Sequence, residues 1–139
     1  MGPPLHASAV ALTPAAGVLI LGPSGVGKSS LALRLMALGA RLVADDGVAL
    51  TVQAGALIAR APAPIAGLIE ARGAGILHAE ALAQARIVLA VDLGRDETER
   101  LPPSREIAFL GVTLPLVLRL QHGHLEAVIL QWLKAGRAM

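Results

Sequence analysis

The architecture of this chain is set by the run Gly22-Pro23-Ser24-Gly25-Val26-Gly27-Lys28-Ser29, which matches the pattern G-x-x-x-x-G-K-[ST]. Apolar residues 18–21 come before it and predict a strand. Residues 31–38 follow it, and their apolar side chains repeat at helical spacing. A glycine-rich turn between a strand and a helix gathers backbone N–H groups at the positive end of the helix. The sequence therefore predicts a phosphate-binding loop rather than an ordinary turn.

The side chains of this run suit a nucleotide. Its glycines permit backbone conformations that a Cβ would forbid, and they let the backbone approach a ligand closely. Lys28 can reach the β- and γ-phosphates, and Ser29 can offer its hydroxyl to Mg²⁺. The residues expected to hold the nucleotide are Gly22, Pro23, Ser24, Gly25, Val26, Gly27, Lys28, Ser29 and Ser30.

The composition fits one domain over residues 1–139 with an aliphatic core. The chain is 55% hydrophobic and 16% charged, so a core is easily built. Phe109 and Trp132 are the only aromatic residues other than His, so Leu, Ile, Val and Ala must fill that core. The absence of cysteine excludes disulfides and thiolate metal sites.

Charge and hydropathy bear on partners and location. The net charge is +2, and the Arg and Lys residues are scattered, so nucleic-acid binding is not expected. No apolar run reaches the roughly 18 residues of a spanning helix, so no membrane partner is expected. Residues 1–6 lack the basic start of a secretory signal, and we expect a cytoplasmic protein.

An acidic pair follows the second predicted strand of this region. Residues 41–44 predict a short strand, and Asp45 and Asp46 come directly after it. In phosphoryl transfer, one such carboxylate can hold Mg²⁺ through water and another can accept a proton from the attacking hydroxyl. Asp-Asp-Gly is also good turn chemistry, and the spacing alone leaves both interpretations open.

Residues 48–60 predict a β-hairpin, because two strand-like segments flank Gln53-Ala54-Gly55. A parallel phosphate-binding fold would place a crossover helix here, so the hairpin favours a mixed sheet. Further on, Glu70 and Arg72 stand two residues apart, and an extended segment would place both side chains on one face. Glu70 could bind Mg²⁺ and Arg72 phosphate oxygens. A surface ion pair is the alternative, although it would not explain the adjacent glycines.

The remaining segments show simpler patterns. We expect a short helical turn over residues 79–85, a buried strand over 86–92 and a solvated charged loop over 94–100. Two strands are expected over residues 105–110 and 112–118. Apolar side chains on one face of residues 125–134 predict a C-terminal amphipathic helix.

Three motifs resemble the catalytic domain of HPr kinase/phosphorylase, the family that phosphorylates a regulatory serine on the phosphocarrier protein HPr. Residues 22–29 resemble its Walker A loop, and residues 42–46 its acidic strand end. Residues 69–77 read I-E-A-R-G-A-G-I-L, similar to the family signature I-E-[IV]-R-G-[LIV]-G-I-[IL]. The resemblance implies an α/β P-loop kinase domain of the HPr kinase and phosphoenolpyruvate carboxykinase type, with a mixed sheet, antiparallel hairpins and a C-terminal helix.

The resemblance also implies a reaction and catalytic residues. It implies ATP and Mg²⁺ as cofactors and HPr as the protein substrate. Asp46 matches the general base for serine phosphorylation, which is the proton donor in the reverse direction. Lys28 would contact the phosphates. His6 lies upstream of the loop at nearly the distance of the family's active-site histidine, and Arg100 matches an active-site arginine.

The metal ligands implied by the resemblance are Ser29, Glu70 and Asp45. The chain begins near the catalytic domain, so the resemblance is to a compact form that lacks the family's N-terminal domain. The family's C-terminal P-x-R-P-G-R-N-like loop, linked to phosphorylase activity and subunit contacts, is not evident. The resemblance implies a homo-oligomer, while phosphorolysis and the family's hexamer are left open.

Two other functions remain open from the sequence. One is a P-loop kinase for a small molecule, and the other is a nucleotide-sensing regulator without catalysis. The presence of Asp45, Asp46 and Glu70 favours catalysis, because a protein that only binds nucleotide needs no base.

Overall fold

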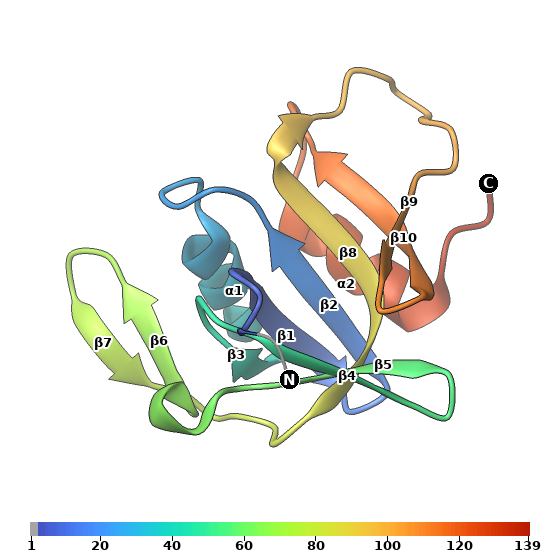
Figure 1. Cartoon of the computed structure of the whole chain (residues 1–139). Coiled ribbons are helices and arrows are strands. Elements are labelled where there is room, and N and C mark those ends of the chain that lie inside the picture. The colour runs from blue at the N-terminus through green and yellow to red at the C-terminus, as the bar shows by residue number, and fades with distance from the viewer. Residues whose placement is uncertain (1–2) are drawn as a thin grey trace.

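A computed structural model describes residues 3–139 as a curved mixed sheet with both long helices packed on one face (Figure 1). The strands are β1 (Ser8–Thr13), β2 (Ala16–Leu21), β3 (Arg41–Ala44), β4 (Ala49–Gln53), β5 (Ala56–Arg60), β6 (Leu68–Ala71), β7 (Gly75–His78), β8 (Ala85–Asp96), β9 (Glu106–Phe109) and β10 (Val112–Arg119). The helices are α1 (Lys28–Ala37), the short 3₁₀ helix η1 (Ala63–Ile65) and α2 (Leu125–Ala135). The expected α/β class and C-terminal helix are confirmed.

The sheet combines parallel and antiparallel pairs. Its strand order is β3-β1-β2-β8-β10-β9, and β5 adds the β4–β5 hairpin through β8. The pairs β2–β8 and β8–β10 are parallel, whereas β1 is antiparallel to both β2 and β3. The strand that ends at the glycine loop is therefore separated by β1 from the strand that ends at the acidic pair. This confirms the mixed sheet that the hairpin at residues 48–60 predicted.

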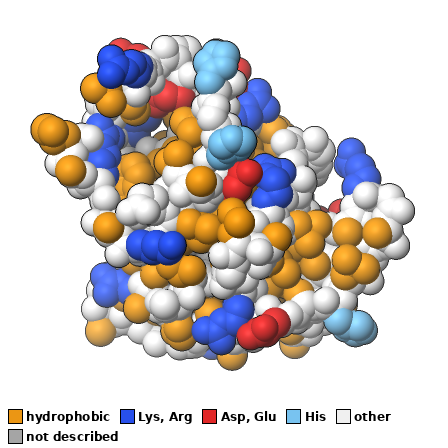
Figure 2. All heavy atoms as spheres, turned by 180° about the vertical axis from the view of Figure 1, so that it is seen from behind, with side chains coloured by type: hydrophobic (Ala, Val, Ile, Leu, Met, Phe, Trp, Pro, Cys, Tyr) orange, Lys and Arg blue, Asp and Glu red, His pale blue; other side chains and the backbone are white. Residues whose placement is uncertain are grey.

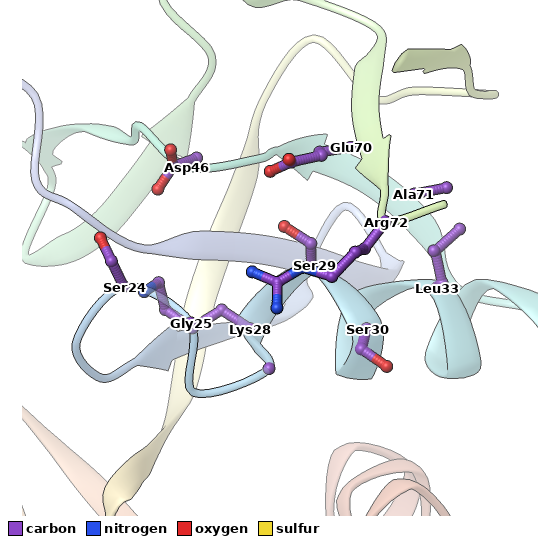
Figure 3. A pocket seen from close by; sticks show the side chains of 11 residues that line it. Ser24, Gly25, Lys28, Ser29, Ser30, Leu33, Asp46, Glu70, Ala71 and Arg72 are labelled. Carbon is purple, nitrogen blue, oxygen red and sulfur yellow. The ribbon is translucent and has the colours of Figure 1, made fainter. Parts of the chain in front are cut away.

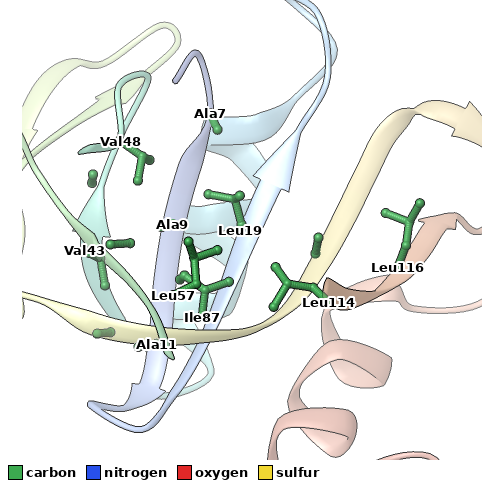
Figure 4. Packing of buried hydrophobic residues seen from close by; sticks show 14 of the residues in the cluster. Ala7, Ala9, Ala11, Leu19, Val43, Val48, Leu57, Ile87, Leu114 and Leu116 are labelled. Carbon is green, nitrogen blue, oxygen red and sulfur yellow. The ribbon is translucent and has the colours of Figure 1, made fainter. Parts of the chain in front are cut away.

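Alternating side chains build a core on each face of the sheet. On β2, Val18 and Ile20 pack with Leu31 and Leu35 of α1, while Leu19 points to the opposite face. That opposite face is covered by the β4–β5 hairpin, and Figure 4 shows its small aliphatic side chains. Alanine is common in the core on this face, and the two aromatic residues, Phe109 and Trp132, pack only at the margins of the two cores.

The surface has no concentrated charge on the face seen in Figure 2. Basic, acidic and apolar side chains are interspersed there. Among the described helices, none is both long and apolar enough to cross a membrane.

Two expectations for the middle of the chain are wrong. No helix forms over residues 79–85, because the backbone of Glu80 and Leu82 exchanges hydrogen bonds with Leu42 at the edge of β3. Residues 68–77 are not one extended segment. They fold into the β6–β7 hairpin, a two-stranded sheet of its own that stands apart in Figure 1.

The charged run at residues 94–100 also differs from the expectation of a solvated loop. Strand β8 continues to Asp96, and Glu97 is buried. Its carboxylate accepts hydrogen bonds from Nε and Nη2 of Arg105, both at 2.9 Å. Backbone N–H groups of Thr98 and Glu99 donate to the same carboxylate. The Arg105 guanidinium, more than any other group, holds the pKa of Glu97 below its ordinary value.

Glu97 should make the stability of this region depend on pH. Since the pKa of Glu97 is lower in the folded state than in the unfolded state, its contribution is present above the ordinary carboxyl range. It is lost as the pH falls through the folded pKa. We expect Arg105→Met to destabilise the protein at neutral pH, with a difference from wild type that shrinks on acidification, measured by urea denaturation across pH. Arg119→Met, which breaks the exposed pair with Asp96, is the control and should change little.

Helix α2 should contribute strongly to stability through one side chain. Ile129 is fully buried, whereas its neighbour Val128 is 39% exposed. Ile129→Ala should lower the free energy of unfolding by about 2–5 kcal/mol, and Val128→Ala by less than about 1 kcal/mol. Urea denaturation of both variants checks this, and equal losses would contradict the packing of α2 described above.

Candidate functional site

A cavity of about 420 Å³ lies where the glycine loop, the start of α1, the acidic pair and the β6–β7 hairpin meet (Figure 3). Segments far apart in the sequence therefore share one site. The cavity is lined by Ser24, Gly25, Gly27, Lys28, Ser29, Ser30, Leu33, Asp46, Glu70, Ala71 and Arg72.

The glycine loop, residues 22–29, has the backbone that its sequence predicted. Gly22 and Gly27 have φ angles of 142° and 108°, in the region that favours glycine. A Cβ on Gly22 would lie only 2.7 Å from Cγ1 of Val26. Gly27 caps α1, so the helix begins at Lys28 in the cavity wall. The N–H groups of the first helical turn lack intrahelical partners, and such a helix start favours an anion.

Lys28 is buried and is held by its own loop. Its ammonium group donates to the carbonyl oxygens of Gly22, at 2.7 Å, and Pro23, at 3.1 Å. It also lies 3.5 Å from Nε2 of His6. These contacts keep the positive charge at the cavity, where oxygens of an anionic ligand could replace the carbonyl groups.

Asp45 joins separate elements through its buried carboxylate. Oδ1 accepts hydrogen bonds from the hydroxyl groups of Ser29, at 2.6 Å, and Ser8, at 2.8 Å. Oδ2 accepts the backbone N–H of Glu70 at 2.9 Å. Asp45 is not itself among the residues that line the cavity. Its carboxylate therefore orients Ser29 and Glu70, which do line it.

Asp46 points the other way, toward solvent and His6. Its side chain is 57% exposed, and its Oδ1 lies 3.0 Å from Nδ1 of His6. The other ring nitrogen of His6, Nε2, lies 3.0 Å from the hydroxyl of Ser24 in the glycine loop. The fold thus brings His6, Asp46, Ser24 and Lys28 together.

Glu70 and Arg72 both line the cavity, although not as neighbours on one strand. Glu70 lies on β6, and Arg72 lies in the turn that follows it. Both residues are in the described part of the chain, and no ion pair joins them there. The alternative of a mutual surface ion pair is therefore not observed.

Arg100 is not brought to this site. It lies in the segment after β8 and lines a second cavity of about 260 Å³ beside α2, together with Trp132 and Arg137. Strand β8 extends to Asp96, farther than expected, and the segment that follows packs against β10 and α2.

The structure adds residues that the sequence did not single out. Leu33 and Ala71 supply apolar surface to the cavity, and Ser8 bonds both aspartates from strand β1. The available signal for Ser8 was a hydroxyl directly before the apolar residues 9–12 of strand β1, and its partners were not evident from local sequence.

The oxygen ligands that the cavity presents suit Mg²⁺ bound together with phosphate better than a metal ion held by protein side chains alone. Within residues 3–139, no group of three or more His, Asp or Glu side chains could hold a metal on its own. The cavity presents the hydroxyl of Ser29 and the carboxylate of Glu70. Mg²⁺ is typically held by one or two protein oxygens together with substrate phosphates, so these residues fit it.

The mixed sheet and the glycine loop at this cavity define a P-loop α/β domain, and comparison with known proteins shows its family. A family profile described as HPr Serine kinase C-terminal domain matches residues 4–129. The chain belongs to this family, as the three sequence motifs indicated.

Relatives of known name agree with this assignment. The chain is 47% identical over 66 residues to HPr kinase/phosphorylase of Clostridium tetani, covering 48% of this chain and 22% of the relative. It is 52% identical over 63 residues to the Brevibacillus brevis protein of the same name, covering 45% and 20%. The chain thus aligns with about a fifth of the length of these relatives.

A solved structure extends the similarity to nearly the whole chain. It is described as the Hpr(Ser) kinase/phosphatase from Coxiella burnetii and superimposes with a TM-score of 0.78 at 26% identity. The match covers 96% of this chain and 89% of that one. The expected fold is therefore confirmed.

The two aspartates should differ sharply in their effect on stability. Asp45→Asn must turn an amide NH₂ toward a hydroxyl or the N–H of Glu70, and should cost about 1.5–3 kcal/mol of unfolding free energy. Asp46→Asn keeps a residue type that tolerates positive φ and is half exposed, so it should cost less than about 1 kcal/mol. Urea denaturation of the two variants tests this, and a larger loss for Asp46→Asn would contradict the geometry.

Proposed function

We propose that this domain is a Mg·ATP-dependent protein-serine kinase that phosphorylates HPr. The observation that carries the proposal is the Asp46–His6 pair at the rim of the cavity that holds Lys28 and the glycine loop. The family assignment and the names of the relatives support it. Half-exposed Asp46 favours a serine on a protein over a small molecule enclosed in a pocket.

In this proposal each residue has a distinct task. Bound Mg·ATP supplies the γ-phosphoryl group and partial neutralisation of its charge. Asp46 accepts the proton of the serine hydroxyl as the new O–P bond forms and the bond to the ADP oxygen breaks. His6, bonded to Oδ1 of Asp46, orients that carboxylate. Lys28 exchanges its loop carbonyls for phosphate oxygens and balances their charge.

The remaining residues hold the cofactor. The backbone of residues 22–30 cradles the phosphates, and Ser29 and Glu70 are the proposed Mg²⁺ ligands. Asp45 acts on the metal indirectly, by accepting the Ser29 hydroxyl. Arg72 is placed to contact phosphate oxygens. We assign no step to Arg100, because it lies beside the second cavity.

The wider setting is proposed on the same basis. We propose that residues 1–139 act as one catalytic domain, in the cytoplasm where ATP is supplied, and as a homo-oligomer. Asp46 would return its proton in the reverse direction, so phosphorolysis is a second activity to examine with the same assay.

The decisive measurement is mass spectrometry of HPr after incubation with the protein, ATP and Mg²⁺. We expect a single phosphate on wild-type HPr and none on HPr whose regulatory serine is replaced by alanine. Adding inorganic phosphate then tests removal of the group. Transfer to small alcohols but not to HPr would instead favour a small-molecule kinase, and tight ATP binding without any transfer would favour a nucleotide sensor.

Asp46→Asn should separate catalysis from binding. Loss of the base should lower the rate of transfer by about 10²–10⁴-fold, because proton transfer in the transition state contributes that much. ATP affinity should stay close to that of wild type, since Asp46 lies at the rim. Asp96→Asn, an exposed carboxylate on β8 outside the cavity, is the matched control and should keep full activity. A normal rate for Asp46→Asn would overturn the role of Asp46.

A further inference from the structure

Ser8 carries a buried hydroxyl group in a mostly apolar strand, and this hydroxyl both donates and accepts a hydrogen bond. Its side chain is inaccessible to solvent, as are those of its neighbours Ala7 and Ala9. The hydroxyl donates to Oδ1 of Asp45 at 2.8 Å and accepts the backbone N–H of Asp46 at 3.2 Å. A buried hydroxyl is costly unless it is bonded, so this position is built around the two aspartates.

Asp46 needs such support because of its backbone. Its φ angle is 57°, a left-handed conformation that non-glycine residues adopt rarely, although Asp and Asn adopt it more readily than most. A backbone of this kind persists where surrounding contacts fix it. It also sets the direction in which the Asp46 carboxylate leaves the chain.

The segment before and within β1 supplies these contacts on both sides of the Asp46 turn. On one side the Ser8 hydroxyl holds the Asp46 N–H. On the other side Leu5 and Val48 exchange two backbone hydrogen bonds of 2.8 and 2.9 Å. Between these two links lies His6, whose Nδ1 is 3.0 Å from the Asp46 carboxylate.

The strand register explains why Ser8 meets this turn. Ala9 of β1 lies opposite Ala44, the last residue of β3, so Ser8 reaches the first residue beyond that strand. His6 and Ser8 are two residues apart, and they contact successive parts of the same acidic turn.

We propose that Ser8 is a positioning residue for phosphate transfer, which fixes the Asp46 backbone so that its carboxylate faces His6 and the incoming hydroxyl. The proposal rests on the proposed function. It predicts a selective defect in Ser8→Ala. The Asp46 N–H loses its acceptor, whereas Asp45 keeps its bonds from Ser29 and Glu70, so the nucleotide side of the site is retained.

The first test compares the effect of Ser8→Ala on kcat with its effect on the KM for ATP. We expect Ser8→Ala to lower kcat for HPr phosphorylation by about 10–100-fold, the scale on which small misplacements of a catalytic group act. The KM for ATP should change by less than about threefold, because the loop and Ser29 remain in place. Ser8→Thr keeps the hydroxyl and should restore most of the rate.

The matched control is Val10→Ala, two residues along the same strand. Val10 is fully buried but packs against the helix side, and removing its methyl groups lowers stability without touching the aspartates. It should keep a normal kcat. If Val10→Ala lowers kcat as much as Ser8→Ala, or if Ser8→Thr does not restore the rate, the effect of Ser8 is general destabilisation and the proposal fails.

A second measurement does not depend on activity. Hydrogen exchange of the Asp46 amide, followed by NMR, should be faster in Ser8→Ala than in wild type and Ser8→Thr, while core amides of β2 stay protected. Unchanged exchange at Asp46 would overturn the proposal. If wild-type protein transfers no phosphate to HPr, the proposed function fails, and this exchange experiment alone decides whether Ser8 holds Asp46.

Discussion

The carboxylate of Asp45 is buried, so the protein has to supply the hydrogen bonds that water would otherwise donate to it. A buried carboxylate without partners is far more costly than one that accepts several hydrogen bonds. Its donors come from β1, α1 and β6, through Ser8, Ser29 and the Glu70 amide. Moving β6 leaves Oδ2 without its donor, and moving β1 or α1 leaves Oδ1 with one donor in place of two. Strand β1, the start of α1 and the β6–β7 hairpin are therefore joined through a single side chain.

The antiparallel strand β1 makes this arrangement possible. It lies between β2, which leads into the glycine loop, and β3, which leads into the acidic pair. Its own N-terminal end reaches the same edge of the sheet and carries His6 and Ser8. In an all-parallel sheet, loops alone would have to supply these groups. Here Ser8 lies on the strand itself, and His6 lies in the short segment between the Leu5–Val48 bridge and the strand. Such fixed elements hold side chains more rigidly than free loops do.

Features encoded in local patterns could be predicted from the sequence. The glycine loop, the strand at residues 41–44, the hairpin at 48–60 and the C-terminal helix all have characteristic periodicity or turn residues. Features that depend on distant partners could not. Residues 79–85 do not form a helix because their backbone bonds to Leu42, and Glu97 is buried because Arg105 covers it.

The same distinction between local patterns and distant partners applies to the residues of the candidate site. Lys28, Ser29, Asp46 and Glu70 stand in motifs, and the structure brings them to one cavity. Arg100 was matched to an active-site arginine of the family, and that match does not show that β8 carries its segment past the glycine loop. Ser8 belongs to no motif, because its contacts with the acidic pair arise from the pairing of β1 with the neighbouring strand β3.

The β6–β7 hairpin forms one wall of the cavity but shares no strand pairing with the main sheet. A two-stranded sheet on its own is only marginally stable in water, so this wall depends on a few anchors. One anchor is fully buried Ile69, and another is the Glu70 amide bonded to Asp45. We therefore expect the amides of this wall to exchange their hydrogens sooner than those of the main sheet. The shape of the cavity on this side then depends on two residues, Ile69 and Glu70, where the hairpin meets the core.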